Sequence, residues 1–177
     1  MRVFKTKFKG LLIVKQKNNI DKRGILRETF NNKILKKKFI FEYCTASKKN
    51  VLRGFHFQSK FKQSKYVNVV KGKILDVVVD LRKKSKTYGK TFKIILSKNN
   101  ALGLFIPSGF GHAYYSYEKE NIIYYKLDNY YAPKYESGII YNDKSLKIKW
   151  PRKKMLVSSK DKKLLTFKQF NKIFRGI

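Results

Sequence analysis

The chain has 177 residues, 42% of them hydrophobic and 15% aromatic, and this composition predicts a folded domain with a sizeable core rather than a disordered chain. Its single cysteine, Cys44, excludes an internal disulfide framework and a cysteine-rich zinc site, and we expect it to be a small buried apolar side chain in a reducing compartment. No apolar run approaches the length of a membrane span, so we expect one cytoplasmic domain over residues 1–177 with no membrane partner.

The formal charge of +32 comes from 43 Lys and Arg residues against 11 Asp and Glu residues, and such a charge favours binding to nucleic acid or to an anionic surface. The basic residues are spread over the whole chain and are mostly lysine, and no helix-turn-helix, zinc-finger or RNA-binding motif accompanies them. We therefore interpret the charge as a solvated lysine-rich surface that also attracts an anionic substrate, and we expect no specific nucleic acid partner.

The first third of the chain indicates short strands and loops, and the middle predicts one short strand after another. Runs of β-branched and aromatic residues are separated by turn residues such as Lys71-Gly72 and Pro107-Ser108-Gly109. Many short strands of this kind are typical of a jelly roll whose interior can hold a ligand, so we expect an all-β fold. Only residues 162–174 repeat apolar side chains every three or four positions, which predicts a short C-terminal helix. The expected strands are residues 66–70, 73–80, 91–96, 104–106, 113–117 and 121–126.

The only two histidines, His56 and His112, each lie in a strongly patterned segment, residues 51–58 and 106–113. Histidine accepts and returns a proton near neutral pH, which makes both residues candidates for a catalytic base. A histidine on a strand is equally often a hydrogen-bonded core residue, and the spacing alone leaves both interpretations open.

The pattern Gly-x-x-x-Pro-x-Gly-x-x-His over residues 103–112 resembles the second half of a cupin motif. Cupins that bind a metal often do so through a His-x-His pair, a nearby Glu and a later His. Here Gln58 stands two residues after His56, no carboxylate occurs between His56 and Asp76, and there is no third histidine. Because two histidines without an acidic partner make a poor divalent site, we expect no metal.

Further segments follow one another in the order found in the dTDP-4-dehydrorhamnose 3,5-epimerase family and related nucleotide-sugar epimerases. The resemblance covers nearly the whole chain. It implies a cupin jelly roll (double-stranded β-helix), a homodimer, and no metal or organic cofactor. The segments that carry it are residues 21–28, 51–58, 76–90, 106–113, 125–133, 141–151 and 158–161.

The resemblance also implies a reaction at carbons next to a ketone. In a 4-keto sugar the hydrogens at C3 and C5 can be removed by a base to give an enolate, and an acid on the opposite face of the ring then inverts the centre. By resemblance, His56 is the base, Asp161 orients its ring, Lys65 stabilises the enolate oxygen and Tyr125 returns the proton. Taken alone, Lys65, Tyr125 and Asp161 would be interpreted as ordinary surface or packing residues.

The same resemblance assigns a second group of residues to substrate binding. Arg53 and His112 would line the sugar pocket, Tyr131 would stack on the nucleobase, and Arg23 would meet the diphosphate, from its own or from the neighbouring subunit. The full group is Arg53, His112, Arg23, Glu28, Gln58 and Tyr131.

Strand alternation raises a difficulty for Arg53. Residues two apart on a strand share a face, so Arg53 and His56 point in opposite directions unless a bulge or bend near Gly54 brings them together.

The chain departs from the family pattern at residues 41–45, where relatives carry a Gln-x-Asn-x-Ser type element. Here Phe41 and Tyr43 replace both amides, and we expect the selectivity to differ from that of the ordinary enzyme.

The sequence therefore predicts an epimerase that inverts C3, C5 or both in a dTDP-linked 4-keto-6-deoxyhexose during deoxysugar synthesis. An epimerase specific for one carbon or for another nucleotide-linked sugar is an alternative. So is a non-catalytic basic cupin that binds a nucleotide sugar or nucleic acid.

Overall fold

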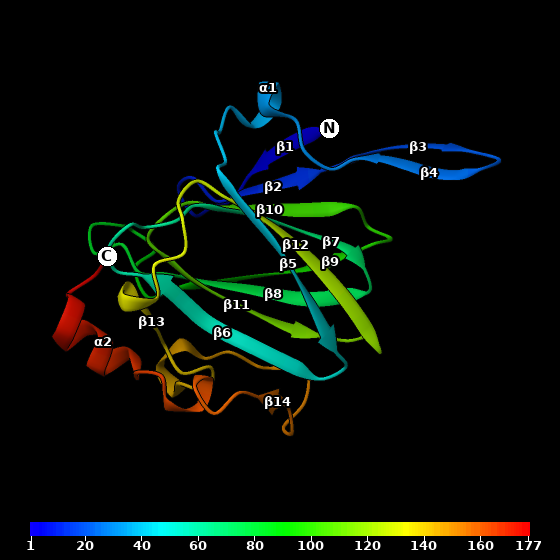
Figure 1. Ribbon diagram of the computed structural model, residues 1–177. Coiled ribbons are helices and arrows are strands. Elements are labelled where there is room, and N and C mark those ends of the chain that lie inside the picture. The colour runs from blue at the N-terminus through cyan, green and yellow to red at the C-terminus, as the bar shows by residue number, and fades with distance from the viewer.

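The structure, a computed structural model that describes residues 1–177, is a sandwich of two largely antiparallel β-sheets (Figure 1). Successive strands alternate between the sheets along much of the chain, so the predicted all-β jelly roll is confirmed. The first sheet has the order β1 (Arg2–Lys5), β2 (Leu12–Lys15), β10 (Leu102–Ile106), β7 (Lys65–Lys71), β12 (Glu120–Leu127) and β5 (Phe41–Lys48). The second has the order β13 (Glu136–Gly138), β6 (Val51–Gln58), β11 (Phe110–Ser116), β8 (Lys73–Asp80) and β9 (Thr91–Ser97), and β14 (Leu156–Val157) pairs with β6.

Every strand expected between residues 66 and 126 is present, within three residues of its predicted bounds. The sequence of strand β8 is an almost continuous apolar run because both faces of the strand are buried. Val78 packs into the core between the sheets, whereas Val77 and Val79 pack into a second core on the outer face. A strand that is covered on both faces needs apolar side chains at consecutive positions.

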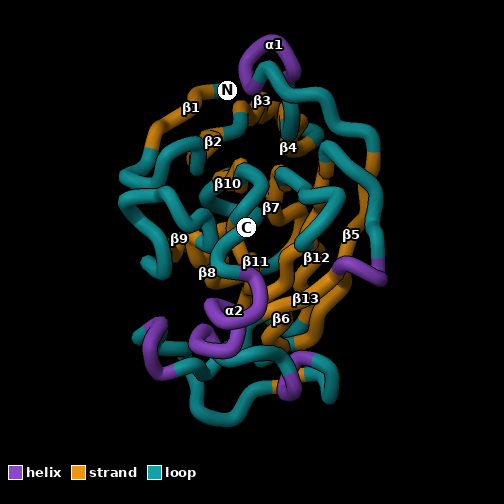
Figure 2. Tube along the Cα trace, turned by 90° about the vertical axis from the view of Figure 1, so that its left-hand side faces the viewer, coloured by secondary structure: helices purple, strands orange, loops and turns teal.

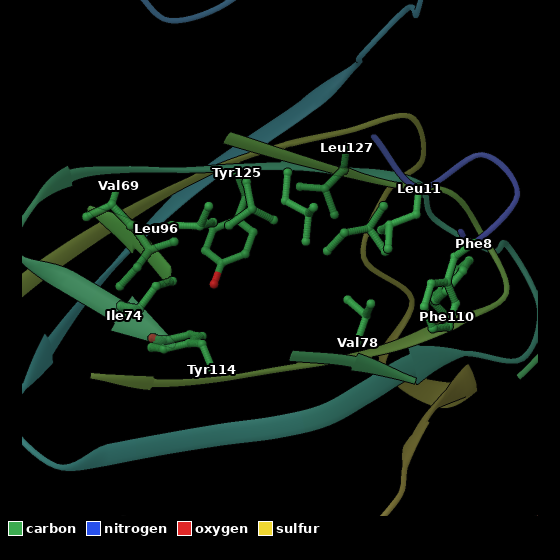
Figure 3. Close-up of a cluster of buried hydrophobic side chains, with 14 residues drawn as sticks. Phe8, Leu11, Val69, Ile74, Val78, Leu96, Phe110, Tyr114, Tyr125 and Leu127 are labelled. Atoms are coloured by element: carbon green, nitrogen blue, oxygen red, sulfur yellow. The ribbon is translucent and has the colours of Figure 1, made fainter. Parts of the chain in front are cut away.

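Fourteen buried residues fill the space between the two sheets (Figure 3). Most are aliphatic, but Tyr114 and Tyr125 belong to the same cluster. In Figure 3 the Tyr125 ring extends from one sheet into the interior, with its hydroxyl directed towards the opposite sheet. A polar atom in such a position needs a partner, which marks this end of the interior as a place where a ligand could bind.

The outer face of the second sheet is covered by the C-terminal helix, α2 (Phe167–Phe174). Phe57 on β6 contacts the rings of Phe170 and Phe174 at centroid distances of 5.4 and 5.5 Å. The helix is shorter than the 162–174 predicted. Residues Asp161–Lys163 form a 3-10 turn, η3, and Leu165 then forms a parallel bridge to Ile139, which keeps the chain extended. A capping box between Thr166 and Gln169 starts the helix only after this bridge.

The first third of the chain contains strands and loops, as predicted, together with one short helix, α1 (Asn32–Leu35), which was not predicted. Asn31 caps this helix by accepting a hydrogen bond from the Lys33 backbone N–H. Helices α1 and α2 lie on opposite sides of the strands (Figure 2). Strands β3 (Lys17–Asp21) and β4 (Gly24–Glu28) form a hairpin that projects from the body of the molecule (Figure 1).

The prediction that Cys44 is buried is wrong, because its side chain is exposed. Cys44 lies on β5, which is the last strand of the first sheet and has few buried positions. The remaining connections include two further 3-10 turns, η1 (Pro133–Tyr135) and η2 (Lys144–Leu146). No helix is long and apolar enough to span a membrane.

Candidate active site

A bulge in β6 brings Arg53 and His56 to one side of the sheet. On β11, the partners of His56 and Arg53 are His112 and Tyr114, so a step of three residues on β6 faces a step of two on β11. Gly54 has a φ of +108°, and a Cβ atom there would lie 2.4 Å from the His112 carbonyl oxygen. Only glycine fits this position. The bulge that strand alternation required is therefore present, and both side chains line the same cavity.

His56 is held by a buried carboxylate. Its Nε2 atom lies 2.8 Å from Asp161 Oδ1, and Asp161, at the start of η3, is only 3% exposed. The Gly54 backbone N–H donates to Asp161 Oδ2 at 3.0 Å. Burial acts to raise the pKa of Asp161, but the hydrogen bonds from His56 and Gly54 outweigh it and the pKa lies below its usual value. An ionised carboxylate can only accept, so His56 Nε2 carries the hydrogen and Nδ1 is left free to take a proton.

Lys65, the first residue of β7, lines the same cavity as His56. Its ammonium forms no hydrogen bond or ion pair within the chain. Burial lowers the pKa of Lys65 to about 8, although the negative charges of Glu136 and Asp76 act in the opposite direction. The amine is therefore still mostly charged at neutral pH and has a free hydrogen-bonding capacity.

Tyr125 on β12 is 3% exposed. Burial, and then the neighbouring Tyr114 and Tyr43, raise the pKa of its phenol well above the usual value, so the group is a neutral proton donor. The Tyr125 ring stacks on that of Tyr43, with centroids 4.7 Å apart and planes at 22°. It also packs edge-to-face with the His112 ring, with centroids 6.1 Å apart and planes at 66°.

His112 is paired with a carboxylate as well. Its Nε2 lies 2.8 Å from Asp76 Oδ2, and both residues are buried. His112 still lines the inner cavity, but its hydrogen-bonded, buried position is that of a core histidine. The two histidines therefore differ in accessibility: the His56 side chain is 28% exposed and the His112 side chain is 6% exposed.

These side chains enclose two adjoining chambers that share Tyr43, His56 and Lys65. The inner chamber has a volume of about 170 Å³, and the outer one about 360 Å³. Beyond the shared residues, the inner chamber is lined by Thr45, Arg53, His112, Tyr114 and Tyr125. The outer chamber is lined by Phe41, Phe57, Gln58, Gln63, Tyr131 and Glu136. A small polar chamber thus opens into a larger, partly aromatic one.

Two predicted binding residues stand in the outer chamber. Gln58 uses its amide to hold the wall, since Nε2 donates to the Phe61 carbonyl at 2.7 Å and Oε1 accepts from the Ala132 N–H at 2.8 Å. Tyr131 lies at the chamber mouth and is 49% exposed. Its hydroxyl donates to Glu136 at 2.8 Å.

The structure does not bring Arg23 and Glu28 to either chamber of their own chain. Arg23 is on the β3–β4 hairpin and pairs with Asp21 at 2.7 Å, and Glu28 accepts a hydrogen bond from Asn31. Neither residue lines a chamber of its own chain, so their assignment to substrate binding, from their own or from a neighbouring subunit, stays a prediction.

Glu136 is a site residue that sequence reasoning missed. It lies on β13, lines the outer chamber and forms an ion pair with Lys160. Burial acts to raise its pKa, but hydrogen bonds from Lys160 and Tyr131 outweigh it and keep the pKa below its usual value. A three-residue strand is too short for alternation to reveal which side chain faces a cavity. In the sequence, Glu136 is distinguished only by the scarcity of acidic residues in this chain.

No cluster of three or more His, Cys, Asp or Glu residues is arranged to hold a metal ion. The jelly-roll cavity holds a histidine–carboxylate pair, a lysine and a buried tyrosine, a set of groups that fits a cupin of the isomerase class. The sequence profile of the dTDP-4-dehydrorhamnose 3,5-epimerase family matches residues 5–169. The chain belongs to this family.

Individual relatives agree with this assignment. The dTDP-4-dehydrorhamnose 3,5-epimerase of Methanothermobacter thermautotrophicus is 39% identical over 169 residues, which cover 91% of each chain. The dTDP-6-deoxy-D-glucose-3,5-epimerase of Legionella pneumophila, solved with dTDP-4-keto-L-rhamnose, has a TM-score of 0.89 and 34% identity, covering 93% of this chain and 92% of that one. The Bacillus anthracis enzyme, solved with TDP and PPi, has a TM-score of 0.91 and 34% identity, covering 94% and 99%. The predictions of an enzyme and of an isomerase of this family are confirmed.

Proposed function

We propose that this protein inverts C3 and C5 of a dTDP-linked 4-keto-6-deoxyhexose in deoxysugar synthesis. The observation that carries the proposal is the convergence of a base, a cation and an acid on the inner chamber: the His56–Asp161 pair, Lys65 and Tyr125. The sugar would occupy the inner chamber. The nucleotide would occupy the outer one, whose volume of about 360 Å³ lies in the range of small-molecule sites.

In the first step His56 removes the hydrogen from C3 or C5. The electrons of the broken C–H bond form a C=C bond, and the ketone oxygen becomes an enolate oxygen. The Lys65 ammonium has no partner within the chain and is available to stabilise this charge. A charged donor of this kind is most effective in a site with little water.

In the second step the Tyr125 phenol gives its proton to the opposite face of the same carbon. The C–H bond re-forms with inverted geometry, leaving a phenolate and an imidazolium. Exchange with solvent returns both groups to their starting states. A deuteron from heavy water therefore enters each carbon that reacts.

The remaining residues are proposed to bind the substrate. Arg53, whose Nε donates to Ser47 Oγ at 3.3 Å, and His112 would contact sugar oxygens. Tyr131 would stack on the nucleobase at the mouth of the outer chamber. Arg23 and Glu28 would reach the nucleotide of a second subunit through the projecting hairpin, in a homodimer.

The test is deuterium incorporation from heavy water into dTDP-4-keto-6-deoxyglucose, followed separately at C3 and C5. The wild type should incorporate deuterium, and His56→Asn should lower the rate by about 10²–10⁴-fold, the usual contribution of a positioned base. Lys71→Arg, at an exposed position on β7 that lines neither chamber, serves as a control that keeps the wild-type rate. If the wild type exchanges neither carbon, the protein is a binder and not an epimerase.

A further inference from the structure

We propose that Tyr43 is a positioning residue for Tyr125, and that it sets how often a deprotonated carbon is inverted rather than reprotonated on its original face. The inference rests on the proposed function. It gives a role to Tyr43, which takes no direct part in the two proton transfers described above.

The first support is the register of the two strands. Tyr43 on β5 and Tyr125 on β12 are directly paired across the antiparallel ladder. Their rings are stacked at 4.7 Å with an angle of 22° between the planes. Directly paired aromatic side chains restrict each other's rotamers, because a large movement of one ring would separate the stacked faces.

The second support is a further ring contact of Tyr125. Its ring packs edge-to-face with that of His112, whose Nε2 lies 2.8 Å from Asp76 Oδ2. Tyr125 therefore contacts two rings, Tyr43 and a buried, hydrogen-bonded histidine. Removing the Tyr43 ring takes away the stacked contact and leaves the His112–Asp76 pair unchanged.

The third support is the position of Tyr43 between the chambers. Like His56 and Lys65, Tyr43 lines both the inner and the outer chamber. Burial of its phenol, and then the neighbouring Tyr114 and Glu136, raise the pKa of Tyr43 to about 12, so the hydroxyl stays protonated near neutral pH. The ring rather than an ionised hydroxyl is the part of Tyr43 that can orient Tyr125.

Tyr43 can also be replaced without removing a core side chain, since it lies on an edge strand and is 36% exposed. Phe41 provides a matched control on the same strand. Its ring lies 5.8 Å from that of Tyr43 and 6.1 Å from that of Tyr130, and it lines only the outer chamber. A change at Phe41 should alter substrate affinity without altering the fate of the deprotonated carbon.

The experiment measures, at early times in heavy water, the ratio of inverted to non-inverted product among deuterated molecules of dTDP-4-keto-6-deoxyglucose. Tyr43→Ala and Tyr43→Leu should lower this ratio about two- to tenfold, the range expected for loss of one stacked aromatic pair. Tyr43→Phe keeps the ring and should retain the wild-type ratio. Phe41→Leu should raise KM and leave the ratio unchanged.

A purely structural role for Tyr43 would lower exchange and inversion together and leave the ratio constant. A wild-type ratio in either folded variant, Tyr43→Ala or Tyr43→Leu, would overturn the inference while the exchange itself upholds the proposed function. Absence of exchange in the wild type would instead contradict the proposed function, and the inference with it. Circular dichroism establishes which variants are folded.

Discussion

Lys65 carries a positive charge at a half-buried position. The cost of desolvating that charge determines the pH range in which the ammonium is present. Burial lowers its pKa to about 8, so the ammonium that would stabilise the enolate is present below this pH and is lost above it. The deuterium-exchange rate should therefore fall as the pH rises through about 8. A rate that stays constant to pH 9.5 would contradict the assignment.

The variant Lys65→Arg tests whether the alkaline decline comes from loss of the Lys65 charge or from titration of another group. A guanidinium keeps its charge throughout the alkaline range, so the variant should be slower but should lack the decline above pH 8. Lys71→Arg, at the exposed end of the same strand, should keep the wild-type profile. The same alkaline decline in Lys65→Arg and wild type would assign it to another group.

At the scale of single elements, the bulge in β6 affects both the stability of the fold and the geometry of the site. Gly54 combines a φ of +108° with a Cβ position 2.4 Å from the His112 carbonyl oxygen. Gly54→Ala should lower the free energy of unfolding by about 2–4 kcal/mol, from backbone strain and from overpacking, and should also lower activity because Arg53 and His56 separate. Urea denaturation measures the loss.

Gly24 offers a matched control for this prediction. It has a φ of +130° on the β3–β4 hairpin, but a Cβ atom there meets nothing within 4 Å. Gly24→Ala therefore adds backbone strain alone and should cost about 1 kcal/mol. Equal losses at Gly54 and Gly24 would show that the close approach to His112 contributes nothing.

The middle strands were predictable from the sequence, the C-terminal helix was predicted with a start five residues too early, and helix α1 was not predicted. Runs such as residues 73–80 are β-branched and bounded by turn residues, so local preference and tertiary structure agree. Leu164 and Leu165 fit the helical spacing of the tail equally well, yet their contacts with β13 and Ile139 keep them extended. Helix α1 has only four residues, too few for a periodic signal.

At the scale of the whole molecule, the site depends on contacts that no local pattern contains. His56 and Asp161 are 105 positions apart, and Tyr43 meets Tyr125 only because β5 pairs with β12. The resemblance named His56, Lys65 and Tyr125, which line one chamber, and Asp161, which holds His56. It did not indicate the stacking of Tyr43, since that position departs from the family pattern.

The net charge of +32 acts at the scale of the whole molecule, because it attracts anionic substrates over a distance. Lysines cover much of the surface, but within the chambers the cations are Arg53 and Lys65, opposed by the single carboxylate of Glu136. A basic surface would raise the local concentration of a diphosphate-bearing substrate, and basic side chains in the inner chamber would then orient it. This long-range attraction weakens as salt is added.

The most direct test of the account is the effect of Tyr125→Phe on exchange and inversion, measured separately at C3 and C5 in heavy water. The variant keeps the His56–Asp161 pair and removes the acid on the opposite face. Deuterium exchange should therefore persist, whereas the inverted product should fall by about 10²–10⁴-fold. Inversion at the wild-type rate, or an equal loss of exchange and inversion, would contradict a reaction in which His56 and Tyr125 act on opposite faces of the sugar.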